Sequence, residues 1–351
     1  MKLLLLIVLI LKFASSLRGG VNHLNMVLSD AERFKNVDSD KGAMKRVGSK
    51  FRNRIGSNEY PAESGRYRIY VSKACPWAHR TLIVRALKGL EDVISVTYTG
   101  PHLKHLKESF DPTQSYLYKG WNFDSEICVE PHGFEYLDEL YEYAEPGYRE
   151  SCPQRPSFTV PILFDDKTQT IVNNESGDII EMLNADFNAF AKNAHLDLNP
   201  IALHEAQEQI NAIVYPGIND GVYRCGFAQT QAAYEFAYNE HWKAMDKIEN
   251  LLSEHPFLCG KQITLADIRL FVTLIRYDPV YYSHFKTSRN KLIEMPNLLR
   301  FTQAIYHLPG VADTVDIHFI KLHYFGSHDN LNPSGIIPKG PSLNYLLSSC
   351  A

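Results

Sequence analysis

The fold is decided by residues 66–98, whose sequence is RYRIYVSKACPWAHRTLIVRALKGLEDVISVTY. Apolar side chains alternate with more polar ones along residues 66–71, and this period of two predicts a half-buried strand. Residues 76–90 place apolar side chains on one helical face, and Pro76 suits a first helical turn, where a missing N–H costs nothing. The β-branched run 93–98 predicts a second strand. Together they make a βαβ unit, which implies a parallel pair of strands.

The chain that follows this unit completes one domain. Residues 99–157 contain many prolines and few regular patterns, so we expect a long insertion with one helix. Apolar runs, turn residues and caps predict that helix at 134–144 and strands at 159–164 and 170–172. They also predict a helix that is capped by residues 173–176 and runs through Leu183. The order β-α-β-insertion-β-β-α predicts an α/β thioredoxin-like domain over residues 66–190.

The second half of the chain is expected to be helical. Residues 200–325 contain a long periodic segment, Gln229–Leu252, in which apolar side chains recur at helical spacing. Thr264 and Asp267 form a capping box ahead of another apolar run, with Asp in place of the commoner Glu. Residues 326–351 are rich in proline and glycine, so we expect a tail without regular structure.

The N-terminal residues have a different composition from the rest. Residues 1–20 combine Lys2, a short apolar run and small residues, which is typical of a removable signal peptide that leads into the secretory pathway. A signal anchor or a misassigned start codon is the alternative, and the protein is cytoplasmic if this segment is not functional. An N-terminal extension follows over residues 21–65. Residues 17–50 are basic and serine-containing, which suits import into a plastid with extra membranes, although their acidic residues argue against this destination. The apolar run is too short for a comfortable membrane span.

Composition excludes several classes of function. An apolar fraction of 45% and 20 tyrosines in 351 residues provide for packed cores. A net charge of −4 gives no basis for a nucleic-acid partner, which requires a basic face. The 6 cysteines include no CxxC pair and no zinc-type spacing, so we expect neither a disulfide scaffold nor a metal.

Cys75 is the strongest candidate for a catalytic residue. It stands where a strand ends and a helix begins, and the partial positive charge of a helix N-terminus favours the thiolate, which is the nucleophile. A dithiol motif would carry its second cysteine at the position of Ala78, so an external thiol must resolve a disulfide formed here. The alternative is a buried structural cysteine, which the strand-Cys-Pro-helix context disfavours.

Two further segments are suited to a peptide-like ligand. Thioredoxin-like folds carry a cis-proline beside the active cysteine, and the residue before it offers its backbone to the ligand, which points to Val160 and Pro161. The trans form is the alternative. Glu175 and Ser176 begin a predicted helix, where free N–H groups and a hydroxyl can bind a carboxylate. An ordinary helix cap is the alternative for this pair.

These motifs, in this order, resemble the Xi-class glutathione transferases, which are the glutathionyl-hydroquinone reductases. The matching segments are SKACPWAHR at 72–80, TVPIL at 159–163, NNES at 173–176, NDGVYRCGFA at 219–228, IRYDPVY at 275–281, HFIKLHY at 318–324 and NPSGIIP at 332–338. The likeness covers residues 58–341. It implies a thioredoxin-like N-terminal domain followed by an all-α glutathione-transferase C-terminal domain, and a homodimer.

The resemblance also implies a reaction and its residues. Cys75 would attack the glutathionyl sulfur of a glutathionyl-hydroquinone, and a second glutathione would resolve the Cys75–glutathione mixed disulfide. Glutathione is then the co-substrate, with no metal. The implied glutathione-binding residues are Trp121, Val160 through its backbone, Glu175 and Ser176. Tyr223 and Tyr324 would face the aromatic substrate, either to bind a quinol oxygen or to protonate the leaving carbon.

The chain departs from the family pattern at two places. Phe164 stands where the family usually has Trp, and Ser157 stands where it often has Arg, with Arg155 two residues earlier. A contact from that arginine to a glutathione carboxylate is therefore open. Competing functions are a dehydroascorbate reductase or general deglutathionylase with the same Cys75 chemistry, and a non-catalytic carrier of glutathione or aromatic ligands. Conjugation of glutathione to electrophiles is disfavoured, because a cysteine at this position favours mixed disulfides.

Overall fold

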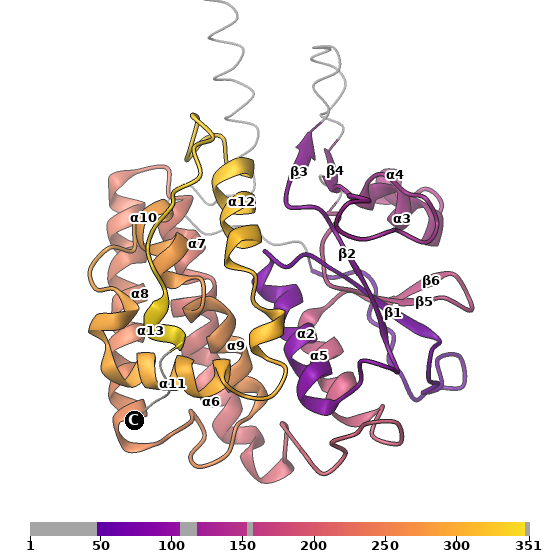
Figure 1. Ribbon diagram of the computed structural model, residues 1–351, viewed down its shortest axis with the longest axis horizontal. Helices are drawn as coiled ribbons and strands as arrows, with labels where there is room; N and C mark the ends of the chain where they lie inside the picture. Colours follow the sequence, from indigo (N-terminus) through magenta and orange to yellow (C-terminus); the bar gives the residue numbers. More distant parts are fainter. Residues whose placement is uncertain (1–47, 106–117, 153–156, 348–351) are drawn as a thin grey trace, which may run out of the picture.

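The computed structural model describes residues 48–105, 118–152 and 157–347. The expected signal segment 1–20 and most of the extension 21–65 lie outside this part of the chain. Two bodies stand side by side, a small sheet with its helices and a larger bundle of helices (Figure 1). This is the expected α/β thioredoxin-like domain followed by an all-α domain.

The first body is built on a four-stranded sheet in the order β2-β1-β5-β6. Its strands are β1 Tyr67–Val71, β2 Ser95–Tyr98, β5 Ile162–Asp165 and β6 Thr170–Asn173. β1 runs parallel to β2, as the βαβ unit predicts, and β5 and β6 form the expected antiparallel hairpin. The half-buried strand predicted at β1 is instead buried almost throughout, because the insertion covers its other face: Tyr70 packs on Phe123 and hydrogen-bonds Glu130.

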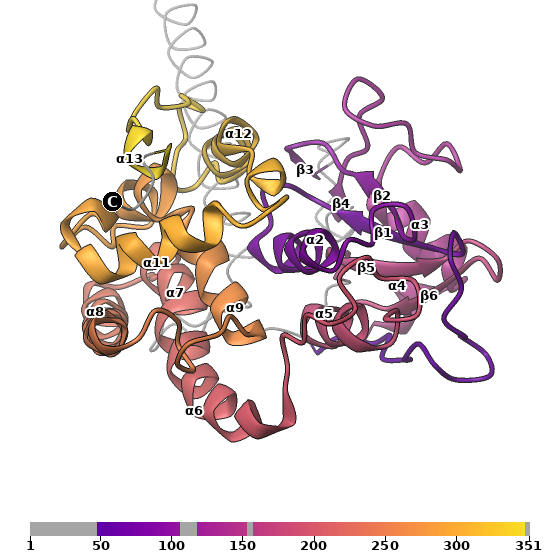
Figure 2. The ribbon, with the colours of Figure 1, turned by 60° about the horizontal axis from the view of Figure 1, so that its bottom comes forward.

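Two helices lie between this sheet and the helical bundle, α2 Pro76–Lys88 and α5 Ser176–Ala185 (Figures 1 and 2). Pro76 occupies the first turn of α2, as predicted. Gly89 ends the helix in the left-handed region at φ 65°, and its N–H closes onto the carbonyls of Ala86 and Arg85. This end brings the chain back toward β2, so α2 serves as the crossover between parallel strands.

The insertion 99–157 contains more structure than its sequence indicates. The expected helix is present as α3 Leu137–Ala144, but the insertion also holds a short helix, α4 Tyr148–Ser151, and a second sheet. That sheet pairs β3 Leu103–His105 with β4 Tyr118–Trp121. Strands of three and four residues are too short for a readable alternation, so the expectation of a single helix was wrong.

The described residues before β1 pack on the sheet domain. Arg52 forms an isolated bridge with Asn173 of β6, and the N–H of Asn53 donates to the Val172 carbonyl at 3.0 Å. The ring of Phe51 stacks against Tyr148 at 5.8 Å between centroids. The end of the N-terminal extension therefore continues the edge of the sheet beyond β6 rather than hanging free of it.

The second body is a bundle of helices, joined by short turns. Its main helices are α6 His204–Val214, α7 Gly221–Gly226, α8 Gln231–Glu254, α9 Leu265–Leu274, α11 Pro296–Tyr306 and α12 Ile317–Ser327. The long helix expected at 229–252 is confirmed as α8. The predicted capping box of α9 is confirmed too, with Asp267 accepting from the N–H of Thr264 at 2.7 Å. No helix in the described ranges has the length and apolarity needed to cross a membrane.

Shorter helical turns link these helices. They are η1 Ile201–Leu203, η2 Tyr215–Asn219, η3 Tyr277–Tyr281, α10 Tyr282–His284, η4 Leu292–Glu294 and η5 Ala312–Thr314. The tail after α12 is irregular, as expected, apart from the short helix α13 Asn344–Leu347. It is docked on the bundle, because Lys321 donates to the carbonyls of Lys339 at 3.0 Å and Gly340 at 2.8 Å (Figure 1).

Candidate active site

Cys75 stands at the point where β1 gives way to α2, as the sequence predicts. It is the N-cap residue of α2 and is 9% exposed. Its Sγ donates to the Val160 carbonyl at 3.6 Å, and the Val160–Pro161 peptide bond is cis. The structure therefore brings together the predicted nucleophile and the predicted backbone partner for a peptide-like ligand, although they are 85 residues apart in the chain.

The turn before Cys75 is held by the helical domain. Arg276, fully buried, donates to the Lys73 carbonyl at 2.9 Å and to the Ala74 carbonyl at 2.9 Å. The Lys73 ammonium in turn pairs with Asp316, which caps α12. Sequence reasoning missed Arg276, since its role depends on two domains meeting.

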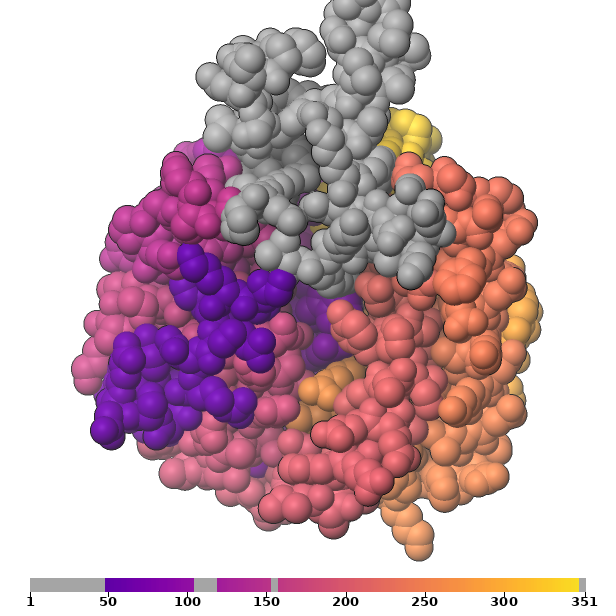
Figure 3. Space-filling model, turned by 180° about the vertical axis from the view of Figure 1, so that it is seen from behind, coloured from indigo at the N-terminus to yellow at the C-terminus, as the bar shows by residue number. Residues whose placement is uncertain are grey.

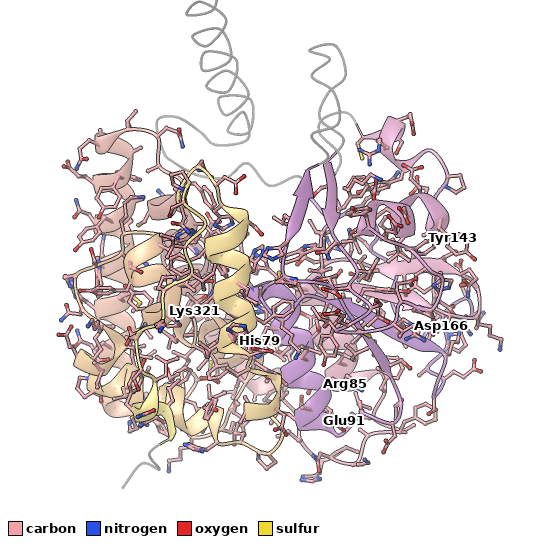
Figure 4. All side chains as sticks on the ribbon, turned by 45° about the horizontal axis from the view of Figure 1, so that its top comes forward. His79, Arg85, Glu91, Tyr143, Asp166 and Lys321 are labelled. Carbon is pink, nitrogen blue, oxygen red and sulfur yellow. The ribbon has the colours of Figure 1, made fainter. Side chains whose placement is uncertain are left out.

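His79 links α2 to the same arginine. Arg276 can only donate, so Nδ1 of His79 accepts from it at 3.0 Å, and Nε2 carries the proton toward Thr314 at 2.8 Å. Burial, together with the positive charge of Arg276, holds the pKa of His79 well below its ordinary value. The ring is thus neutral and structural, at the junction of the two domains (Figure 4).

Glu175 and Ser176 form the start of α5. Glu175 is its N-cap: one carboxylate oxygen accepts from the N–H of Gly177 at 3.2 Å and the other from the Ser49 hydroxyl at 2.9 Å. The backbone N–H of Glu175 donates to the Asn173 side chain at 2.7 Å. The capping role that the sequence left as an alternative is therefore present. Ser49 gave no signal in the sequence, because it comes from a segment with no regular pattern.

Arg80 lies behind this helix start. Its guanidinium donates to the Ser176 hydroxyl at 3.4 Å and to the Asn219 side chain at 3.2 Å, and it stacks over the Trp77 ring at 4.3 Å. Burial and the neighbouring charge of Arg269 lower the pKa of Arg80 to about 9. A buried cation in contact with Ser176 favours an anionic ligand at this end of the site.

Trp121 belongs to β4 of the insertion and is buried. Its ring packs on the His323 ring of α12, with centroids 4.4 Å apart. His323 is anchored in turn, since its Nδ1 contacts the Pro101 carbonyl at 2.8 Å. The predicted glutathione-binding tryptophan therefore lies where the insertion meets the helical domain, beside the helix that carries Tyr324.

The two predicted tyrosines are in direct contact. The hydroxyls of Tyr223 on α7 and Tyr324 on α12 lie 2.6 Å apart. A third hydroxyl, that of Tyr281 at the end of η3, lies 2.9 Å from that of Tyr324. Tyr281 falls inside a motif that the family resemblance rests on, yet nothing in the sequence singled it out from the other tyrosines.

The departures from the family pattern have plain outcomes. Phe164 is a packing residue, with its ring edge-on to Tyr70 at 5.8 Å between centroids. The Ser157 carbonyl accepts from the Tyr148 hydroxyl at 3.1 Å. Arg155 lies outside the described residues.

Seen from behind, the sheet domain and the helical domain meet along a seam, hollowed between their surfaces (Figure 3).

Comparison with known proteins gives the family. The family model for the glutathione S-transferase N-terminal domain matches residues 74–186, and that for the C-terminal domain matches residues 231–304. The chain belongs to the glutathione S-transferase family, in its Xi class. The matched ranges divide between the sheet body and the helical body described above. The resemblance drawn from the sequence motifs is therefore confirmed.

The similar proteins match along most of their length. The glutathionyl-hydroquinone reductase YqjG of Escherichia coli is 40% identical, with 88% of this chain and 92% of that protein covered. The glutathionyl-hydroquinone reductase PcpF of Sphingobium chlorophenolicum is 38% identical, with 89% and 94% covered. The crystal structure of a Xi glutathione S-transferase from Phanerochaete chrysosporium matches with a TM-score of 0.76 at 41% identity, covering 86% and 98%. The glutathione-bound structure of YqjG matches with a TM-score of 0.75 at 39% identity, covering 87% and 96%.

Proposed function

We propose that this enzyme reduces glutathionyl-hydroquinones to hydroquinones, with glutathione as co-substrate. Two relatives that cover most of the chain carry this activity in their names. The observation that carries the proposal is the position of Cys75, which caps α2 and lies against the carbonyl before a cis-proline, with Ala78 at the place of a second cysteine. A single thiol in this setting performs exchange with an external thiol.

The reaction runs in two steps. The Cys75 thiolate attacks the glutathionyl sulfur, the sulfur–carbon bond breaks, and its electron pair stays on the ring carbon, which takes a proton from a tyrosine hydroxyl. The products are the hydroquinone and a Cys75–glutathione mixed disulfide. The thiolate of a second glutathione then attacks this disulfide and releases Cys75 and oxidised glutathione. The proton that this glutathione gives up restores the tyrosine.

Glutathione is proposed to bind on the sheet-domain side of the seam. The backbone of Val160 is suited to pair with its peptide, and the start of α5 is suited to its carboxylate, because the Ser176 hydroxyl lies there beside the Arg80 cation. Trp121 would border the same ligand from the insertion. Glutathione-bound structures of Xi-class relatives support a site of this kind.

The test is turnover of glutathionyl-menadiol with added glutathione, followed by the release of menadiol. We expect steady turnover by the wild type and one glutathione adduct on Cys75 by mass spectrometry when free glutathione is limiting. Cys128→Ser is the matched control, because it removes a half-buried thiol from the insertion. Release of menadiol by Cys75→Ser at the wild-type rate would rule out the mechanism.

The same assay separates this function from its alternatives. A general deglutathionylase or a dehydroascorbate reductase would use Cys75 but favour protein mixed disulfides or dehydroascorbate over the glutathionyl-quinol. A carrier would bind glutathione without turnover. Comparison of kcat/KM among the three substrates therefore ranks the candidate reactions directly.

We further propose a homodimer, a secretory destination set by residues 1–20 and no bound metal. Among the described residues no group of three or more His, Cys, Asp or Glu side chains could hold a metal ion. Light scattering of the purified protein tests the oligomeric state. A fluorescent-protein fusion of residues 1–65, compared with the same fusion lacking residues 1–20, tests the destination.

A further inference from the structure

Three tyrosine hydroxyls form a continuous hydrogen-bonded chain inside the helical domain. Tyr281 contacts Tyr324 at 2.9 Å, and Tyr324 contacts Tyr223 at 2.6 Å. The three side chains come from η3, α12 and α7. The ring of Phe285 packs on all of them, with centroids 5.2 Å from Tyr223, 5.3 Å from Tyr281 and 5.7 Å from Tyr324. The chain of hydroxyls therefore runs through an apolar aromatic cluster, where hydrogen bonds are strong and polarise one another.

The burial of the two inner tyrosines, Tyr281 and Tyr324, keeps their protons within this cluster. Both side chains are fully buried, and a buried O–H must donate to an acceptor. The Tyr281 hydroxyl lies 2.9 Å from that of Tyr324 and also interacts with that of Tyr223. The Tyr324 hydroxyl lies 2.6 Å from that of Tyr223. Donation by the inner pair toward Tyr223 satisfies both buried protons.

The two inner hydroxyls keep their protons. Burial raises the pKa values of Tyr281 and Tyr324 well above their ordinary range, although the charge of Arg276 acts in the opposite direction. Tyr223 is the half-buried member of the three. The inner pair thus acts as a permanent donor to the outer tyrosine, which is the member placed to exchange a proton with a ligand.

We propose that Tyr281 is a positioning residue for proton delivery to the substrate ring, an inference that rests on the proposed reduction of glutathionyl-hydroquinones. Tyr223 gives its proton to the ring carbon as the carbon–sulfur bond breaks, and its oxygen is left as a phenolate. The Tyr324 hydroxyl, oriented by Tyr281, donates to that phenolate and stabilises it. Tyr281 itself does not touch the substrate.

The experiment is single-turnover glutathionylation of Cys75 without free glutathione, with two donors. With glutathionyl-menadiol the leaving atom is a ring carbon, which needs the proton. With oxidised glutathione the leaving group is a thiolate, which needs no proton. We expect Tyr281→Phe to slow the reaction with glutathionyl-menadiol about ten-fold, the worth of one hydrogen bond in an apolar setting. The reaction with oxidised glutathione should stay within about two-fold of wild type.

The pH profile gives a second readout. Without the oriented donor the Tyr223 phenolate is less stable, so its pKa rises and the basic limb of the glutathionyl-menadiol reaction moves to higher pH in Tyr281→Phe. Among the residues that the structure describes, the other charged or titratable groups facing these tyrosines include Arg276, His284, His323 and His328. Burial lowers the pKa of His284 to about 4 and that of His323 to about 3, so neither titrates on a basic limb.

The matched control is Tyr277→Phe. It removes another fully buried hydroxyl of η3, one that contacts His241 at 3.0 Å and the Thr287 carbonyl at 3.2 Å instead of the tyrosine chain. We expect it to react like wild type with both donors. Equal rates for Tyr281→Phe and Tyr277→Phe, or equal loss with both donors, would overturn the role of Tyr281. A wild type that reacts with oxidised glutathione but not with glutathionyl-menadiol would overturn the proposed function itself.

Discussion

Cys75 stands in a turn that one continuous segment builds, whereas the tyrosine hydroxyls are gathered from three separate elements. The thiol side follows from local rules: β1 ends, Pro76 starts α2, and the cysteine caps the helix. The tyrosine side joins Tyr223 to Tyr324 across 101 residues of chain, and depends on the packing of the whole bundle. The proposed nucleophile is therefore set by local sequence, and the proposed environment of the leaving group by tertiary structure.

The strongest way to sharpen this comparison is to remove the thiol alone. Cys75→Ser should lower turnover of glutathionyl-menadiol by about a thousand-fold or more, because the step that forms the mixed disulfide is lost. The folded state should be unaffected, since serine fits the same turn. Menadiol release and mass spectrometry of the adduct measure the first effect, and thermal unfolding measures the second. A large fall in the unfolding temperature would mean that Cys75 is mainly structural.

Arg276 sharpens the comparison, because it anchors the locally built thiol turn from the helical domain, and its removal measures how far that turn depends on tertiary structure. Arg276→Met would leave the carbonyls of Lys73 and Ala74 buried without their donor, which should cost about 3–5 kcal/mol of unfolding free energy. Alkylation of Cys75 by iodoacetamide should slow as well, because the turn loses its anchor. Urea unfolding and alkylation rates measure the two effects.

Arg289→Met is the control for this substitution. Arg289 pairs with Asp246 on a partly exposed surface, so its loss should cost less than about 1 kcal/mol. Equal destabilisation by the two variants would contradict the view that the Cys75 turn depends on the buried arginine.

Acid should destabilise the folded state through its buried histidines on both sides of the comparison, since His79 of α2 and two rings of the helical domain all have lowered pKa values. Burial lowers the pKa of His241 to about 4 and that of His323 to about 3, from the ordinary 6.5. The folded state keeps these rings neutral while the unfolded state takes up protons below about pH 6.5. Stability is therefore present above that pH and falls as pH drops toward 4, by about 1.4 kcal/mol per pH unit for each ring. Urea midpoints at pH 7.5 and about pH 5.5 should differ clearly; equal midpoints would refute this.

The smallest effect is expected at a close contact behind the tyrosines. A Cβ added at Gly226 would lie 2.9 Å from the Cβ of Phe285 and closer still to its ring. Gly226→Ala should cost about 1–3 kcal/mol and displace the ring that packs on all three tyrosines, so the glutathionyl-menadiol reaction should slow more than that with oxidised glutathione. Gly48→Ala, where nothing lies within 4 Å, is the control, and equal unfolding midpoints for the two would contradict the contact.

Sequence reasoning reached the elements whose rules are local. The βαβ unit, the hairpin, the long helix and the capping box of Thr264 and Asp267 all follow from spacing and caps, and all are present. The β3–β4 sheet was not predicted, because its strands are too short to show a period. The roles of Arg276 and Tyr281 were not predicted either, since an arginine or a tyrosine in a helical segment has no local signature of the domain contact or hydroxyl chain it makes.

The docked tail has a consequence for the order in which this enzyme becomes competent during synthesis. The Tyr345 hydroxyl donates to Asp278 at 2.9 Å, beside the turn that ends in Tyr281, and the Lys321 contacts tie the same tail to the helix of Tyr324. Domains generally fold as they emerge, N-terminal first. The turn that holds Cys75 is thus synthesised early. The helical domain, which anchors this turn and is proposed to receive the substrate ring, is synthesised last. A nascent chain carries its cysteine well before it can present that cysteine to a quinol conjugate.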